Sequence, residues 1–117
     1  MAVSVNGGLS FASLYHADGV KTSAIQGSIL RVEWQQDGTR SKIVLSNPAS
    51  SRREKMRVYV SYDEGKSWPV SKEVYCGAAA YSCLVKLSDG RLGLLYEKDD
   101  YKTISFAVFS VDWLEQD

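Results

Sequence analysis

Apolar and polar residues alternate along this chain in short runs, and turn-forming residues separate one run from the next. A period of two residues is typical of β-strands that have one buried face. The pattern predicts strands at residues 27–34, 42–46, 57–62, 70–75, 81–87, 92–97 and 103–111. Asp37-Gly38, Asn47-Pro48 and Asp89-Gly90 mark turns between them. No helical periodicity extends beyond two turns, so we expect an all-β fold.

The stretch at residues 61–68, SYDEGKSW, predicts a self-capped turn between two strands. The carboxylate of Asp63 can accept bonds from backbone N–H groups of its own turn, and Gly65 can adopt a positive φ without a steric penalty. Ser67 can add a local hydroxyl bond. The large ring of Trp68 can lie under the turn, with its indole N–H available to a carbonyl.

A weaker copy of this turn occurs near the N-terminus, at residues 4–11. Ser4, Asn6, Gly8, Ser10 and Phe11 each precede their counterpart in the first turn by 57 residues. Asn replaces Asp and Phe replaces Trp, and both replacements keep the physical role. Self-similarity at a fixed period of about 50 residues is typical of repeat folds such as the four-stranded blades of a β-propeller.

Composition narrows the class of protein without identifying it. The chain has 117 residues, 44% hydrophobic and 24% charged, which is ordinary for one globular domain or part of one. Its 14 basic and 14 acidic residues balance, which argues against a nucleic-acid-binding surface. No apolar run is long enough to span a membrane. The N-terminus has no basic segment and no long apolar segment, so we expect no signal peptide.

Cysteine and histidine give no sign of a metal site or a disulfide framework. Cys76 and Cys83 are too few for a disulfide scaffold, and we expect both to be reduced and packed within strands. His16 has no cysteine or second histidine nearby, which favours a packing role over metal binding. We expect no cofactor.

The 61–68 turn resembles the Asp-box of the exo-α-sialidases, differing from S-x-D-x-G-x-T-W only by Ser for Thr. Other segments match the same family in the same order over essentially the whole chain. They are residues 26–30 (QGSIL), 46–48 (SNP), the arginine-containing loop 52–55, 80–82 (AYS), 94–97 (LLYE) and 104–106 (ISF). Asp-boxes of this family are structural, and the combination of segments is far more specific than the box.

The resemblance implies a fold and a division of the chain. The fold would be the C-terminal portion of a six-bladed β-propeller. Residues 1–26 would end one blade, 27–76 would form a complete four-stranded blade, and 77–117 would form a last blade without its fourth strand. In such propellers the opposite terminus supplies the missing strand.

Three family positions carry over to residues of this chain. Arg53 corresponds to the third arginine that binds the carboxylate of sialic acid, with Arg52 as the alternative if the loop shifts by one residue; a guanidinium matches a carboxylate with two parallel bonds. Tyr81 corresponds to the nucleophile, since sialidases use tyrosine in place of a carboxylate. Glu97 corresponds to the glutamate that holds the first arginine of the triad.

The remaining catalytic groups of the family have no counterpart in this sequence. They are the general acid aspartate, the glutamate that partners the tyrosine, and two of the three arginines. We therefore expect part of an enzyme that hydrolyses terminal α-linked sialic acid from glycans with retention, and a chain that is inactive alone. The alternative is a non-catalytic, sialidase-like module that binds carbohydrate or self-associates. Either reading implies a sialylated glycan as partner, together with the missing propeller portion or further copies of the chain. Hydrolysis versus transfer, and a secreted versus a cytoplasmic location, stay open.

Overall fold

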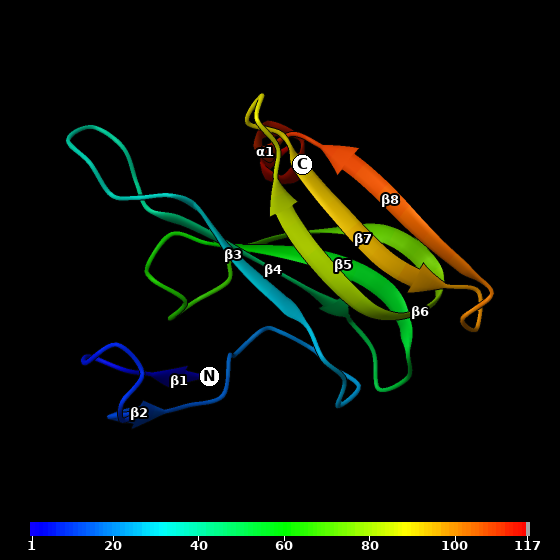
Figure 1. The fold of residues 1–117 in the computed structure, drawn as a ribbon, viewed down its shortest axis with the longest axis horizontal. Helices are drawn as coiled ribbons and strands as arrows, with labels where there is room; N and C mark the ends of the chain where they lie inside the picture. The colour runs from blue at the N-terminus through cyan, green and yellow to red at the C-terminus, as the bar shows by residue number, and fades with distance from the viewer. Residues whose placement is uncertain (117) are drawn as a thin grey trace.

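A computed structural model describes residues 1–116 and shows one curled antiparallel sheet of six strands beside a small N-terminal hairpin (Figure 1). The hairpin pairs β1 (Ala2–Val3) with β2 (Ser13–Leu14). The large sheet contains β3 (Ser28–Glu33), β4 (Lys42–Pro48), β5 (Glu54–Ser61), β6 (Val70–Lys86), β7 (Leu92–Lys98) and β8 (Thr103–Phe109) in chain order. The expected all-β class is therefore observed. Among the residues that the structure describes, none forms a helix with the length and hydropathy of a membrane span.

Strand β6 curls the sheet because it changes partner midway. Its first half pairs with β5, from Val70 to Ala78, and its second half pairs with β7, from Ala79 to Lys86. The second half turns back over β3, where the backbone N–H of Leu84 donates to Ser28 Oγ at 3.0 Å. The sequence prediction of two separate strands, 70–75 and 81–87, was wrong on this point: the small residues at 77–80 permit a bend without breaking the strand.

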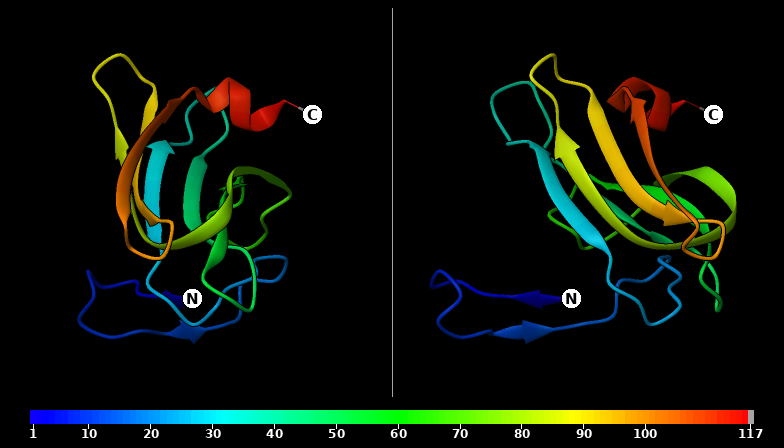
Figure 2. Two further views of the ribbon diagram at one scale, coloured as in Figure 1. Left: turned by 90° about the vertical axis from the view of Figure 1, so that its right-hand side faces the viewer. Right: turned by 45° about the vertical axis from the view of Figure 1, so that its right-hand side comes forward.

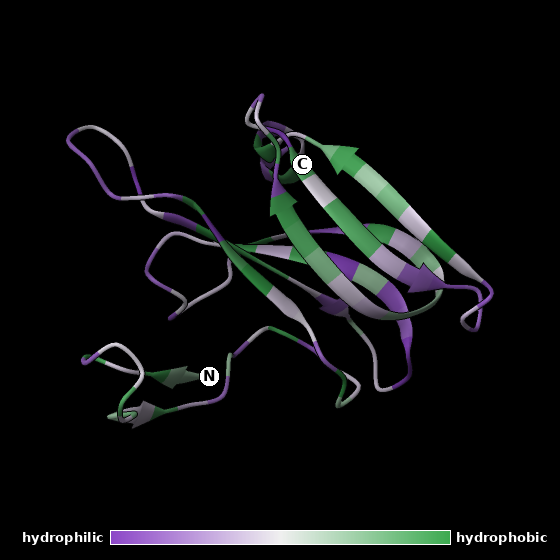
Figure 3. Ribbon diagram, in the orientation of Figure 1, coloured by the Kyte–Doolittle hydropathy of each residue, from purple (hydrophilic) through white to green (hydrophobic). Residues whose placement is uncertain are grey.

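One hydrophobic core fills the curl. Val44, Met56 and Val58 come from the first strands, and Leu92 and Leu94 come from β7; all five side chains are fully buried. Alternation produces this burial, as the bands of apolar residues along β6, β7 and β8 show in Figure 3. The core thus joins both halves of β6 into one packed unit.

A short helix, α1 (Val111–Glu115), lies at one end of the curled sheet (Figure 2). Ser110 caps it by accepting a hydrogen bond from the backbone N–H of Trp113, and Leu114 is fully buried in the core. The sequence prediction of a strand through residue 111 was therefore wrong, because the serine cap and one buried leucine favour a helical turn there.

One further boundary differs from the sequence prediction. β4 continues through Asn47 to Pro48, which pairs with Met56 and is fully buried as the last residue of the strand, so the Asn47-Pro48 pair does not end it early. Residues 12–26 contribute only the two-residue β2 to a sheet. Both cysteines are free, as expected, but both are exposed, so the expectation that they pack within strands was wrong. Cys83 shares the outward face of β6 with Tyr81 and Val85, which are also exposed.

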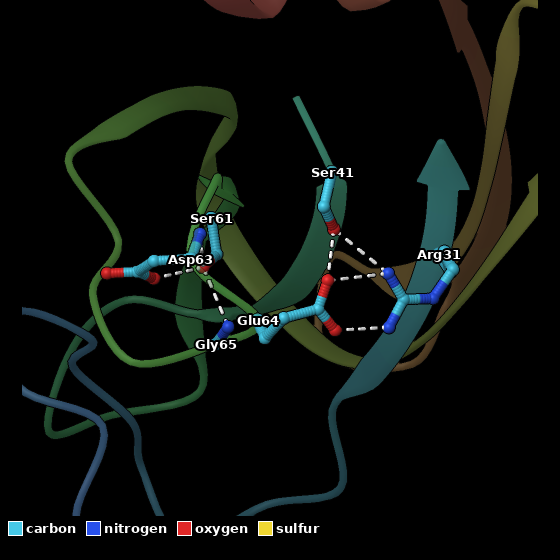
Figure 4. Close-up of polar contacts among 6 residues, drawn as sticks. All are labelled: Arg31, Ser41, Ser61, Asp63, Glu64 and Gly65. Atoms are coloured by element: carbon cyan, nitrogen blue, oxygen red, sulfur yellow. Dashed lines mark hydrogen bonds and ion pairs between the residues drawn. The ribbon is translucent and has the colours of Figure 1, made fainter. Parts of the chain in front are cut away.

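The 61–68 turn, called the Asp-box below, is closed by side-chain hydrogen bonds. Ser61 Oγ donates to Asp63 Oδ1 at 2.9 Å and accepts from the backbone N–H of Gly65 at 2.9 Å (Figure 4). Asp63 also accepts from the backbone N–H and the hydroxyl of Ser67, at 2.8 and 2.6 Å. Gly65 adopts φ +85°, which an L side chain would resist.

The N-terminal copy makes the same bonds. Ser4 Oγ donates to Asn6 Oδ1 and accepts from the backbone N–H of Gly8, while Ser10 N–H donates to Asn6 Oδ1. The two copies differ in their aromatic residue. Trp68 is buried against Ile43 and Tyr59, whereas Phe11 is largely exposed. The indole Nε1 of Trp68 has no hydrogen-bond partner within residues 1–116, contrary to the expected carbonyl contact, because the ring lies among apolar side chains.

Replacing Ser61 with Ala is expected to destabilise the fold by about 1–3 kcal/mol, because the buried N–H of Gly65 loses its acceptor. Ser4→Ala is the matched control, since it removes the same bonds from the solvent-exposed copy. Urea unfolding of both variants measures the difference. Equal losses of stability would contradict the assigned importance of burial at Ser61.

Candidate functional site

The second half of β6 and the loops beside it enclose two adjoining cavities on one face of the molecule. The first, of about 380 Å³, lies between the loop before β5 and the β7–β8 loop. The second, of about 360 Å³, lies over β6 and β7. Glu97 borders both hollows, which are therefore described together as one candidate site.

The three residues singled out by sequence converge on this site. Arg53 lines the first cavity, Tyr81 lines the second, and the guanidinium Cζ of Arg53 is 5.9 Å from the centre of the Tyr81 ring. Glu97 Oε1 accepts a hydrogen bond from the backbone N–H of Tyr81 at 3.2 Å. Residues separated by 28 and by 16 positions in the sequence are thereby brought side by side.

Backbone geometry explains why Arg53 and Tyr81 meet. The N–H of Ala79 donates to the carbonyl of Arg53 at 2.9 Å, which fixes the arginine loop against the bend of β6. Small side chains at Ala78, Ala79 and Ala80 line the first cavity and leave it open. Directly after the bend, Tyr81 points outward and is 52% exposed, so its side chain is accessible from solvent.

Arg53 is held by a residue that the sequence analysis did not single out. Its Nη1 donates to the hydroxyl of Tyr101 at 2.5 Å, and this bond is the main reason that the pKa of Arg53 is raised above its ordinary value. Arg52, the sequence alternative, lines the same cavity, but within residues 1–116 its hydrogen bonds are made by its backbone, to Ser50 Oγ and from the N–H of Glu54. The geometry thus favours Arg53 over Arg52 as the oriented guanidinium.

Gln26 is a second residue that sequence reasoning passed over as a site component. Its Nε2 donates to the carbonyl of Ser82 at 3.3 Å, and the residue lines the cavity that contains Tyr81. The signal was present, since Gln26 opens one of the family-like segments. No group of three or more His, Cys, Asp or Glu side chains that could hold a metal occurs in the described part of the chain.

A separate ion pair fixes the Asp-box to β3. Both terminal nitrogens of the Arg31 guanidinium donate to Glu64, at 2.9 and 2.5 Å, and Ser41 bonds the same carboxylate (Figure 4). These bonds lower the pKa of Glu64 to about 2, Arg31 contributing most. Asp63 in the same turn also has a pKa of about 2, chiefly because the Ser67 hydroxyl stabilises its charged form.

The lowered pKa values of Asp63 and Glu64 predict a loss of stability in acid. A carboxylate whose folded pKa lies below its unfolded pKa stabilises the fold above the unfolded value, and this is lost as the pH falls through the folded value. We therefore expect the melting temperature to fall as the pH drops from about 4.5 to about 2. Asp63→Asn should flatten part of this decline, since Asn6 closes the N-terminal copy without a titrating group. An unchanged slope in that variant, measured by thermal unfolding across the pH series, would argue against the role of Asp63.

Comparison with known proteins gives a consistent result. No family model matches the chain. It is 34% identical to a sialidase from Micromonospora viridifaciens over 97% of this chain and 18% of the relative. It is 28% identical to an exo-alpha-sialidase from Aspergillus fumigatus over 82% of this chain and 27% of the relative. The fold superimposes on the intramolecular trans-sialidase of Ruminococcus gnavus with a TM-score of 0.81 at 23% identity, covering 99% of this chain and 28% of that one. The chain thus spans about a fifth to a quarter of the curated relatives that it matches.

Proposed function

Since the chain belongs to the sialidase family, matching its members over part of their length, we propose that it carries part of a sialidase active site. In this proposal Tyr81 is the nucleophile and Arg53 binds the carboxylate of a terminal α-linked sialic acid. Glu97 is a positioning residue, which fixes the backbone of Tyr81 and orients another arginine of the complete site. The observation that carries the proposal is the convergence of these three side chains on one open site.

The choice of tyrosine has an electrostatic reason. The anomeric carbon of sialic acid bears a carboxylate, so an anionic nucleophile would be repelled as it approached that carbon. A neutral phenol avoids this repulsion, provided that a base removes its proton as the bond to the anomeric carbon forms. The phenolic oxygen then forms the bond, the aglycone oxygen leaves with a proton from a general acid, and water later releases the sugar with retention.

The general acid, the base for Tyr81 and two further arginines are assigned to a region other than residues 1–117. Proton transfer by a positioned acid contributes roughly 10²–10⁴-fold to rate, so the chain by itself should not turn over substrate. Incubation of the purified chain with a fluorogenic α-sialoside tests this assignment. Release of the fluorophore above the rate in buffer would contradict it.

The exposed apolar face of the last three strands supports a need for a covering partner. Leu95, Ile104, Phe106 and Val108 are each more than two-fifths exposed, on the same face as Tyr81 and Val85. β8 forms one edge of the sheet, and its outer backbone groups pair with no strand within residues 1–116. We assign β3, β4, β5 and the first half of β6 to one propeller blade. The second half of β6, β7 and β8 then form part of the next blade, which the rest of a propeller would complete.

The same face also favours the alternative, in which copies of the chain associate as a carbohydrate-binding module without catalysis. Light scattering on the purified chain separates the two functions. A mass above that of one chain, at low protein concentration, favours self-association. A strict monomer would contradict it.

A further inference from the structure

Arg31 and Arg53 differ in their hydrogen-bond partners, and therefore in whether the guanidinium can still bind an anion. The fork of Arg31 is occupied, since both terminal nitrogens bond the carboxylate of Glu64 (Figure 4). Arg53 forms no ion pair within residues 1–116, and its recorded side-chain bond runs from Nη1 to the neutral phenol of Tyr101. No carboxylate within residues 1–116 therefore bonds Arg53 directly, and its other nitrogens remain available to an anion.

The loop that presents Tyr101 has an unusual backbone. Asp99, Asp100 and Tyr101 all have left-handed conformations, with φ of 55°, 55° and 67°. Asp tolerates this region, but a bulky residue such as Tyr rarely adopts it. Such strain persists only where the surroundings enforce it, and it concentrates at functional sites.

The base of this loop is tied to the bend of β6. The backbone N–H of Asp99 donates to the carbonyl of Ala78 at 2.9 Å, and the hydroxyl of Tyr75 donates to the Asp99 carboxylate. The N–H of Lys102 closes the loop by donating to the carbonyl of Asp99 at 3.2 Å. These bonds place Tyr101 beside the same cavity that Arg53 lines.

We propose that Tyr101 is a positioning residue that orients the guanidinium of Arg53 for an anionic sugar without neutralising it. The inference rests on the proposed function, in which Arg53 binds the carboxylate of sialic acid. An uncharged acceptor suits this task better than a carboxylate. Glu97 lines the same cavity, and a bidentate bond from Arg53 to such a group would occupy the fork that the ligand needs. The phenol uses a single donor and leaves the positive charge to the ligand.

The test compares the full chain with Tyr101→Phe by ¹⁵N NMR of arginine side chains. In the original chain the Nη signals of Arg53 are expected to be separate, because the bond to Tyr101 restricts rotation of the guanidinium. Tyr101→Phe removes the acceptor and keeps the ring, so these signals should merge. Tyr15→Phe is the matched control, since it removes a tyrosine hydroxyl that bonds Gly65 far from the cavity.

Titration with N-acetylneuraminic acid, and with its uncharged methyl ester, adds the link to function. We expect Tyr101→Phe to weaken binding of the acid about fivefold, which is the loss expected when one ordinary hydrogen bond that orients Arg53 is removed. Unchanged Arg53 signals in Tyr101→Phe would overturn the inference. If the acid and the ester shift the Arg53 signals of the original chain equally, the proposed role of Arg53 in binding the carboxylate fails instead. The comparison of Nη signals between the original chain and Tyr101→Phe still decides whether Tyr101 orients Arg53.

Discussion

In a chimera where residues 1–117 replace the matching segment of the Micromonospora viridifaciens sialidase, Tyr81→Phe is expected to lower kcat by roughly 10⁴–10⁶-fold, as for the loss of a covalent nucleophile. The substitution removes the phenolic oxygen that would bond the anomeric carbon, while the ring keeps its place beside Arg53. KM should change little, because the carboxylate ligand of the sugar is a different residue. Steady-state kinetics with a fluorogenic α-sialoside measure both constants.

Tyr15→Phe in the same chimera controls for the loss of any tyrosine hydroxyl. Tyr15 bonds the backbone carbonyl of Gly65, far from the two cavities. We expect it to keep the kcat of the parent chimera. If Tyr81→Phe also keeps that kcat, Tyr81 is not the nucleophile.

Leu94→Ala is expected to destabilise the isolated chain by about 2–5 kcal/mol, the largest effect on stability that we predict. Leu94 is 0% exposed in the core that joins the two halves of β6, so its removal leaves a cavity as well as lost apolar burial. Urea unfolding followed by tryptophan fluorescence measures the change.

The neighbouring residue provides a control for this prediction. Leu95 is 47% exposed on the opposite face of β7, so Leu95→Ala should change stability by about 0.5 kcal/mol or less. The contrast tests the register of β7, because a shift by one residue would exchange the two side chains. Similar losses for both variants would contradict the register described here.

Much of this fold follows from local sequence signals. Alternation located the strands, and Asp37-Gly38 and Asp89-Gly90 located two turns, because those signals depend on neighbouring residues. The helix at residues 111–115 was missed because five residues are too few for a helical period. Its formation depends on the Ser110 cap and on burial of Leu114 against distant strands.

The candidate site divides in the same way. Arg53, Tyr81 and Glu97 were found because each lies in a segment that resembles one family, although their roles remain proposals. Tyr101 was missed because its contact with Arg53 spans 48 residues and depends on a left-handed loop that contains no glycine. Local sequence carries no signal for such a contact.

A glycine in β7 is likewise explained only by a long-range contact. Gly93 lies in the middle of β7, where a glycine usually weakens a strand. The ring of Phe106 on β8 lies across it, 2.4 Å from the point where a Cβ would sit. Glycine is therefore required by a neighbour on another strand, which local pattern alone does not reveal.

The central claim, that Tyr81 is the nucleophile of a sialidase site, is tested most directly by trapping the covalent intermediate. A sialosyl fluoride with a second fluorine next to the anomeric carbon forms the intermediate but slows its hydrolysis, because fluorine destabilises the cationic transition state. Peptide mass spectrometry of the treated chimera should place the sialosyl adduct on Tyr81. An adduct on Glu97 or another residue, in a chimera that turns over substrate, would contradict the claim.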